Sequence, residues 1–295
     1  MNYFINRLNL KACLLLLVSV SFASNTHAND KADVLMPKER IVAAGGSVTE
    51  ILFALGAQNT LVGVDSSSLF PASATHIANV GYYRQLSLEG VMSVNPTLVV
   101  GLDSMGPSSV LTQLDSLNIS VKKLPLERNV DGLIYLIRRL GLLVDKSLEA
   151  ERLIEKTLAH LSQLPNLVDT ESRVIFLMSA GSNGLMAAGT DTVPNLIFEL
   201  LQLNNPLAHI DGFKPVSNEV VLAINPDLIL IPTHQQAGRS AEDICQLPSL
   251  ALWANGKGCH IKFVDSLSFL GITPRLPEAA LKVGDWLKAM EQNDA

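Results

Sequence analysis

Short apolar runs alternate with segments of helical periodicity along most of the chain. The runs are rich in Val, Ile and Leu, which is typical of buried strands in a parallel sheet. The predicted strands are 40–44, 61–64, 98–101, 120–124, 173–178, 227–232 and 261–264. The predicted helices are 47–55, 86–94, 108–117, 192–203, 217–224 and 275–290. This alternation on short connections predicts an α/β protein with mainly parallel sheets flanked by helices.

Residues 129–164 depart from this alternation. They hold helix-forming residues throughout, with apolar positions at helical spacing, Gly141 as the one weak point and Pro165 as the stop. We therefore predict one long linking helix between an N-terminal α/β lobe at 29–128 and a C-terminal α/β lobe at 165–295.

An internal repeat supports the two lobes. Segments 87–100 and 217–230 share serine, glutamate, valine, Asn-Pro and leucine in register. Because proline disfavours helical geometry in the residue before it, each Asn-Pro predicts the end of a helix, followed by a buried strand. Ligands of open α/β sheets bind beyond the carboxyl ends of the strands, so two similar lobes predict a cleft between them.

The start of the chain reads as an export signal. Within residues 1–28, Arg7 and Lys11 precede an apolar run at 12–22, and a small-residue cleavage site ends at Ala28. The run is too short to span a bilayer as a helix. The sequence thus predicts a soluble periplasmic protein with no membrane span in its mature form.

Charge and cysteine usage narrow the class further. Residues 1–28 carry two basic and no acidic residues, so their removal changes the net charge from −6 to −8. That balance argues against nucleic-acid binding. The remaining cysteines, Cys245 and Cys259, could form a disulfide in an oxidising compartment, or could stay as two unpaired thiols.

The segment 80–90 carries the candidate chemistry, because it places two tyrosines and an arginine between a glycine and a helix start. A free phenol is a poor ligand at neutral pH, but ferric iron and an adjacent guanidinium favour the phenolate. We interpret Tyr82 as an oxygen ligand to ferric iron and Arg84 as the charge that keeps it ionised. Tyr83 would point the opposite way in an extended segment. Alternatively, the tyrosines are ordinary rim aromatics and Arg84 is a solvated charge.

Motifs along residues 38–290 resemble the periplasmic haem-binding proteins of bacterial haem ABC importers, which belong with the vitamin B12- and siderophore-binding proteins in the helix-backbone (class III) superfamily. The motifs are Gly-Gly-Ser-Val-Thr-Glu-Ile at 45–51, Val-Gly-Val-Asp at 62–65, Gly-Tyr-Tyr-Arg-Gln-Leu-Ser-Leu-Glu-Gly at 81–90, Asn-Pro-Thr-Leu at 95–98 and the long linking helix. The resemblance implies a monomer that carries ferric b-type haem as its transported ligand and has no catalytic cofactor. It makes Tyr82 an axial ligand of the haem iron, with Arg84 beside it, and an inner-membrane ABC permease with its ATPase the partner.

The resemblance does not assign the second axial position to one residue. Some members of the family carry a histidine in the loop that corresponds to 178–184, where this chain has none. His234 follows the predicted strand 227–232 at its carboxyl end, and His209 precedes a segment that resembles the family's second-lobe rim. Either could support the haem site, or could be a surface or hydrogen-bonding histidine.

The resemblance also implies a docking contact. In the B12-binding relatives one glutamate on each lobe docks onto basic pockets of the permease, and by position these fall on Glu50 and Glu219. Glu50 would also complete a capping box with Ser47, and Glu219 would favour the dipole of its helix. Neither local role excludes docking.

Two other functions stay open. The first is the same transport task for a ferric siderophore or a corrinoid, neither of which needs an axial tyrosine. The second is an enzyme that acts on a tetrapyrrole or metal chelate. Against an enzyme, the sequence has no cysteine cluster, no nucleophile elbow, and no Walker lysine after the glycines at 45–49.

Overall fold

Two β-sheets organise the part of the chain that the computed structural model describes, which is residues 39–164, 171–181 and 184–294. Among these residues the first sheet has the order β2-β1-β3-β4, and all its pairings are parallel. The second has the order β7-β6-β5-β8-β9. The strands are β1 (Ile41–Ala44), β2 (Leu61–Val64), β3 (Leu98–Leu102), β4 (Ser120–Leu124), β5 (Val174–Gly181), β6 (Gly184–Ala188), β7 (Phe213–Val216), β8 (Leu228–Pro232) and β9 (Ile261–Val264). The predicted two-lobe α/β class is confirmed.

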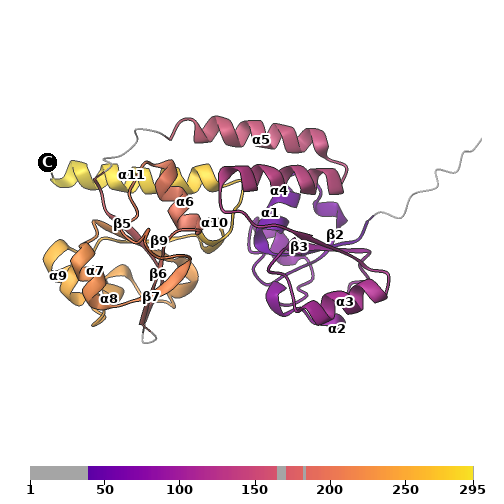
Figure 1. Cartoon of the computed structure of the whole chain (residues 1–295), viewed down its shortest axis with the longest axis horizontal. Helices are drawn as coiled ribbons and strands as arrows, with labels where there is room; N and C mark the ends of the chain where they lie inside the picture. The colour runs from indigo at the N-terminus through magenta and orange to yellow at the C-terminus, as the bar shows by residue number, and fades with distance from the viewer. Residues whose placement is uncertain (1–38, 165–170, 182–183, 295) are drawn as a thin grey trace, which may run out of the picture. The chain divides into compact units, whose positions relative to one another are not determined.

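Helices flank both sheets (Figure 1). The α-helices are α1 (Gly46–Ala54), α2 (Leu88–Met92), α3 (Ser108–Ser116), α4 (Val130–Leu143), α5 (Ser147–Leu161), α6 (Val193–Leu200), α7 (Asn218–Ile224), α8 (Ala241–Cys245), α9 (Ala251–Lys257), α10 (Ser266–Leu270) and α11 (Leu276–Asp294). Short 3-10 turns are η1 (Gln58–Thr60), η2 (Ala72–His76), η3 (Tyr83–Gln85) and η4 (Thr233–Gln235). Because helices cover both faces, every residue of the central strands β1, β3 and β8 is buried.

The internal repeat corresponds to one local structure made twice. Ser87 and Ser217 cap α2 and α7 by accepting hydrogen bonds from backbone N–H groups three residues on. After each helix the asparagine of the Asn-Pro pair takes a left-handed backbone, with φ of 46° at Asn95 and 47° at Asn225. Asparagine tolerates this region better than most residues, and the chain then enters β3 or β8.

The single linking helix predicted over 129–164 is wrong in one respect, because the structure has two helices there. After α4 the chain breaks at Asp145, whose φ is 58°, and α5 runs back beside α4 (Figure 1). Gly141 lies where the two helices meet: a Cβ there would come within 2.5 Å of the Ala150 Cβ. The glycine that looked like a weak point in one helix instead allows two helices to approach each other closely.

The second sheet is mixed rather than mainly parallel. β5, β8 and β9 pair in parallel, but β6 runs antiparallel to both β5 and β7. Residues 184–188, between the predicted strand 173–178 and the predicted helix 192–203, therefore form a strand that the sequence analysis did not predict. The side chains of β6 alternate as in a strand, because Leu185 and Ala187 are buried while Met186 between them is only half-buried.

One hydrophobic core is shared by both halves of the described chain. It joins residues of β1, β3, α1 and α4 from the first half to residues of β5, β8, α6 and α11 from the second. Two smaller clusters lie on the other faces of the two sheets. A shared core opposes large movements of one half against the other, since such a movement would expose buried apolar surface.

Three further features concern stability and location. A disulfide links Cys245 at the end of α8 to Cys259 just before β9, with an S–S distance of 1.99 Å. The predicted signal peptide at 1–28 lies outside the described residues. Within the described residues, no helix has both the length and the apolar character that a membrane span requires.

Candidate ligand-binding cleft

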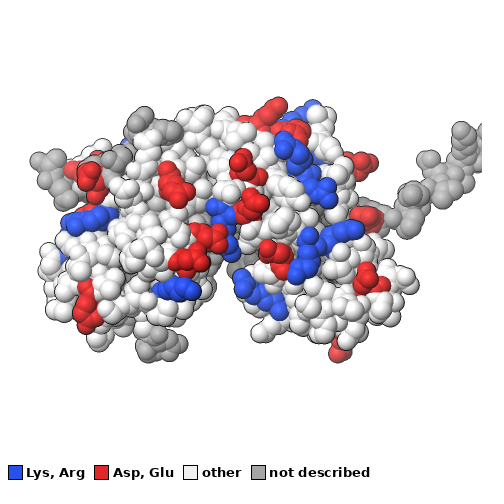
Figure 2. Space-filling model, in the orientation of Figure 1, with Lys and Arg blue, Asp and Glu red and all other residues white. Residues whose placement is uncertain are grey.

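A cavity of about 360 Å³ lies between the two halves at the carboxyl ends of their parallel strands. Its walls come from the segments that follow β1, β2 and β4 and from the last residue of β3 in the first half, and from the segments that follow β8 and β9 in the second. Figure 2 shows the surface hollowed between the two halves, with charged side chains at the rim. This is the position that the sheet topology predicts for a ligand of an open α/β fold.

A buried carboxylate fixes the two loops at the base of the cleft. Asp65 is 1% exposed and accepts hydrogen bonds from the backbone N–H groups of Gly45 and Ser67 and from two serine hydroxyls. On the cleft side, Gly46 lies so close to the second half that a Cβ would come within 2.6 Å of Leu267. The two halves therefore meet in tight contact at the base, and the cavity opens above it.

The segment with the tyrosines is held at the mouth of this cavity. The N–H of Val80 donates to Val64 of β2, and the N–H of Gly106, beyond β3, donates to the carbonyl of Tyr83. Tyr82 has an extended backbone, and its side chain lines the cavity while staying 42% exposed. The Tyr82 side chain is thus accessible both to solvent and to a molecule in the cavity.

Tyr83 does not point away from Tyr82. The prediction assumed an extended segment, but Tyr83 begins the 3-10 turn η3, so its ring stays on the cavity side. The two ring centroids are 4.8 Å apart in an edge-to-face arrangement. Arg84 follows in the same turn, and its Nε donates to the Tyr83 hydroxyl at 2.8 Å.

The role expected of Arg84 changes accordingly, because its direct partner is Tyr83 rather than Tyr82. Burial raises the pKa of Tyr82, the neighbouring Tyr83 raises it further, and the charge of Arg84 opposes both effects only in part. Tyr82 is thus a neutral phenol in the free protein at neutral pH. In the absence of a ligand Arg84 therefore does not ionise Tyr82, and a bound metal would have to displace the proton. That Arg84 favours the phenolate together with ferric iron stays a prediction.

His234 faces the tyrosines from the second half. It lies in η4 directly after β8, and its Nδ1 is 2.8 Å from the Oγ of Ser266, which follows β9. Burial lowers the pKa of His234, so the imidazole is neutral at pH 7 and Nε2 is the ring nitrogen left for a ligand. His209 is exposed and lies outside the cavity wall.

Two cleft residues escaped the sequence reasoning. Arg128 lines the cavity just before α4, and Ser266 holds the histidine. Both lie in segments that follow the carboxyl end of a parallel strand, Arg128 after β4 and Ser266 after β9, and this position was the signal that could have found them. For Ser266 no chemical pattern in the sequence pointed to the cleft.

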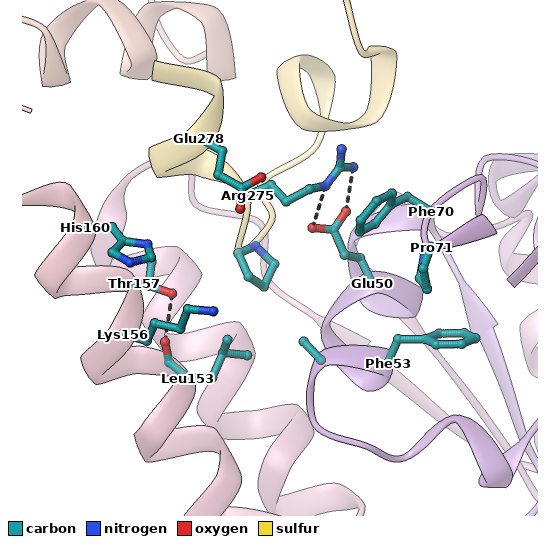
Figure 3. Close-up of a pocket in the computed structure, with 12 residues that line it drawn as sticks. Glu50, Phe53, Phe70, Pro71, Leu153, Lys156, Thr157, His160, Arg275 and Glu278 are labelled. Carbon is teal, nitrogen blue, oxygen red and sulfur yellow. Dashed lines mark hydrogen bonds and ion pairs between the residues drawn. The ribbon is translucent and has the colours of Figure 1, made fainter. Parts of the chain in front are cut away.

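Glu50 has a different environment from the one expected. It is 3% exposed, and its carboxylate pairs with Arg275 through two hydrogen bonds, Nε to Oε1 at 3.1 Å and Nη2 to Oε2 at 2.8 Å (Figure 3). The predicted capping box with Ser47 does not form, because Gly45 is the N-cap of α1. Burial raises the pKa of Glu50 despite the Arg275 hydrogen bonds. A carboxylate that is buried and paired in this way is not presented to a partner protein.

The internal repeat identifies a better counterpart for Glu219. Glu89 occupies the same place after Ser87 as Glu219 does after Ser217, and both glutamates are exposed in the first turn of their helices. A hydrogen bond from Ser217 lowers the pKa of Glu219, which keeps it ionised. The repeat therefore places one exposed glutamate on each half. The alignment of segments 87–100 and 217–230 already contained this pair.

Together, the two lobes with a shared core and a cleft at the carboxyl ends of their strands define a substrate-binding protein of the helix-backbone class. Residues 41–262 match the family described as "Periplasmic binding protein". The chain belongs to this family.

Solved structures and curated relatives agree with this assignment. The apo form of the periplasmic heme-binding protein RhuT from Roseiflexus sp. RS-1 is 31% identical with a TM-score of 0.80, covering 85% of this chain and 99% of that one. The periplasmic heme-binding protein HutB of Vibrio cholerae is 30% identical with a TM-score of 0.77, at the same coverage of both chains. A vitamin B12-binding protein of Vibrio parahaemolyticus is 22% identical over 96% of this chain and 98% of its own length.

Proposed function

We propose that this chain captures ferric haem in the cleft between its lobes, in the periplasm, and delivers it as a monomer to an inner-membrane ABC permease. It would make and break no bond in the haem. The observation that supports this most is the position of Tyr82, a phenol at the mouth of the cavity. The proposal is also supported by RhuT and HutB, whose names describe periplasmic haem binding.

The wall of the cleft suits a haem in three respects. Its apolar side chains offer a surface for the flat macrocycle, namely Leu69, Leu102, Leu126, Leu267, Leu270 and Ile272. The phenol oxygen of Tyr82 is a hard donor suited to Fe(III). The neutral imidazole of His234 faces the same space and is the candidate for the second axial position.

An absorbance titration of the mature protein with ferric haem tests this proposal. We expect saturable binding with a high-spin, phenolate-ligated ferric spectrum, and in Tyr82→Phe a changed spectrum with weaker binding. Tyr135→Phe is the matched control, because Tyr135 is a similarly exposed tyrosine on α4 outside the cleft. An unaltered spectrum in Tyr82→Phe would move the ligand to His234, and His234→Ala would test that. If no haem binds, the haem assignment fails.

A corrinoid is the second candidate ligand, because several curated relatives are named vitamin B12-binding proteins. Cobalt in a corrinoid does not require a phenolate, so Tyr82→Phe would leave corrinoid binding intact. Titration with cobalamin and with a ferric siderophore, alone and against bound haem, separates these ligands. Displacement of haem by sub-stoichiometric cobalamin would favour the corrinoid.

We further propose that Glu89 and Glu219 are the glutamates that dock onto the permease, in place of Glu50 and Glu219. Charge reversal of either, to Lys, should reduce stimulation of the transporter's ATPase in proteoliposomes at least tenfold and leave haem binding unchanged. Glu155→Lys is the control, since Glu155 is an exposed glutamate of α5 outside the repeat. Equal stimulation by the Glu89 variant and this control would refute the assignment.

A further inference from the structure

An ion pair crosses from one lobe to the other beside the cleft. Arg128 precedes Asn129, the N-cap of α4, and Asp191 precedes Thr192, the N-cap of α6. The Nη1 of Arg128 is 2.9 Å from Oδ2 of Asp191. The Arg128 side chain is 28% exposed and lines the cavity, whereas Asp191 is 60% exposed and does not.

Each residue stands next to a helix N-cap that fixes its backbone. Only the two side chains can therefore change partner. Asn129 accepts a hydrogen bond from the N–H of Gly132 at 2.7 Å, and Thr192 accepts one from the N–H of Asn195 at 3.2 Å. Yet the carboxylate of Asp191 is mostly in water. An exposed ion pair of this kind favours its bonded form by no more than about fivefold. A ligand group could therefore replace Asp191 at little cost.

Arg128 is also the cleft cation best placed to take such a group. Among the described lining residues the guanidinium groups are those of Arg84 and Arg128. Arg84 is engaged with the Tyr83 hydroxyl, whereas Arg128 is paired with a carboxylate that is 60% exposed. A guanidinium carries five N–H donors, and only Nη1 of Arg128 is used by Asp191, so Nε and Nη2 can meet a carboxylate as well.

We propose that Arg128 is the receptor for a carboxylate of the bound ligand and that Asp191 competes with the ligand for this guanidinium. The inference rests on the proposed haem-binding function and sharpens its ligand class: a tetrapyrrole with free carboxylate side chains rather than one with amides. Asp191 then acts as a placeholder that keeps Arg128 in position while the cleft is empty.

The test compares ferric haem with its dimethyl ester, which keeps the iron and the macrocycle but has no ionised side chains. Both are titrated into the full protein and into Arg128→Gln and Asp191→Asn, with a fixed small fraction of dimethyl sulfoxide. Arg128→Gln should weaken haem binding about tenfold and leave the ester unchanged. Asp191→Asn should strengthen haem binding about twofold to fivefold, again with no effect on the ester.

The control is Arg138→Gln, which breaks the exposed pair of Arg138 with Glu151 between α4 and α5 and should alter neither affinity. If the cleft pair were only a strut between the lobes, both cleft variants would shift both ligands in the same direction. That result, or an Arg128→Gln variant that binds haem as tightly as the wild type, would overturn the proposal while leaving haem binding intact. If the wild type binds neither haem nor ester, the proposed function and this inference fail together.

Discussion

The ion pair between Glu50 and Arg275 joins the first half of the chain to the start of α11, and its removal is the sharpest stability test the structure offers. The Glu50 side chain is 4% exposed and that of Arg275 is 16% exposed. Arg275 also pairs with Asp265 at 3.0 Å and stacks on Phe70 with its guanidinium carbon 3.8 Å from the ring centroid. Arg275→Met keeps much of the aliphatic volume of the side chain and removes the charge together with the hydrogen bonds to Glu50 and Asp265.

Two effects set the expected cost. Leaving a buried carboxylate without its partner typically costs about 3–5 kcal/mol. Glu50 can escape this penalty by taking up a proton, and for a carboxyl with an ordinary pKa of 4.5 this costs about 3.4 kcal/mol at pH 7. The cheaper route wins, so we expect Arg275→Met to lose about 3 kcal/mol of unfolding free energy at pH 7.

The same reasoning fixes the pH dependence. In the variant the folded-state pKa of Glu50 lies above its unfolded value, so the stabilising effect of its protonation is present at low pH and lost as pH rises. Protonation at pH 5 costs only about 0.7 kcal/mol. The penalty of Arg275→Met should therefore shrink by about 2 kcal/mol between pH 7 and pH 5. Adding Glu50→Gln should recover much of the stability at pH 7.

Urea unfolding at both pH values measures these quantities. The two tryptophans, Trp253 and Trp286, both lie in the second half, so their fluorescence should be compared with far-UV circular dichroism, which reports both halves. Arg138→Met, which breaks an exposed pair, should cost less than about 1 kcal/mol. A loss below 1 kcal/mol in Arg275→Met at pH 7, or one that is equal at pH 5, would refute the reasoning.

Two further predictions concern protonation. Because Tyr82 is neutral in the free protein, its ligation to iron must release its proton. Haem affinity should therefore rise by up to about tenfold per pH unit between pH 6 and 8, and Tyr82→Phe should flatten that slope. An equal slope in the variant would exclude Tyr82 as the source of the proton. The pKa of Asp227 is lowered because hydrogen bonds from Lys257 and the N–H of Arg173 together outweigh the opposing effect of burial. Its contribution should be fully present above the ordinary value of 3.8 and disappear as pH falls through the lower folded value. Asp227→Asn should therefore destabilise the protein at pH 7 and lose that effect progressively below pH 3.8; a penalty that does not change with pH in urea unfolding would contradict this.

Local patterns predicted much of the fold, because the forces behind them act over a few residues. The Val- and Leu-rich runs became the buried strands, and each Asn-Pro pair ended its helix. The break at Asp145 escaped prediction because no glycine or proline marks it, and a single left-handed residue between two helical stretches has no periodic signature. The direction of Tyr83 was missed for a related reason: the turn that sets it is held by Gly106, which lies beyond the next strand.

Contacts between residues far apart in the sequence account for the remaining differences between the predicted and the observed site. For the docking glutamates, the internal repeat was more informative than the local motif around Glu50. Glu50 looked exposed because its sequence resembles the start of a capped helix, yet its partner Arg275 lies 225 residues away. No residue near Glu50 in the sequence indicates that Arg275 is its partner. Glu89, by contrast, could have been inferred, because a residue that repeats in both lobes occupies the same place in both. For a protein built from two similar halves, an exposed functional pair is therefore better sought in the internal alignment than in either half alone.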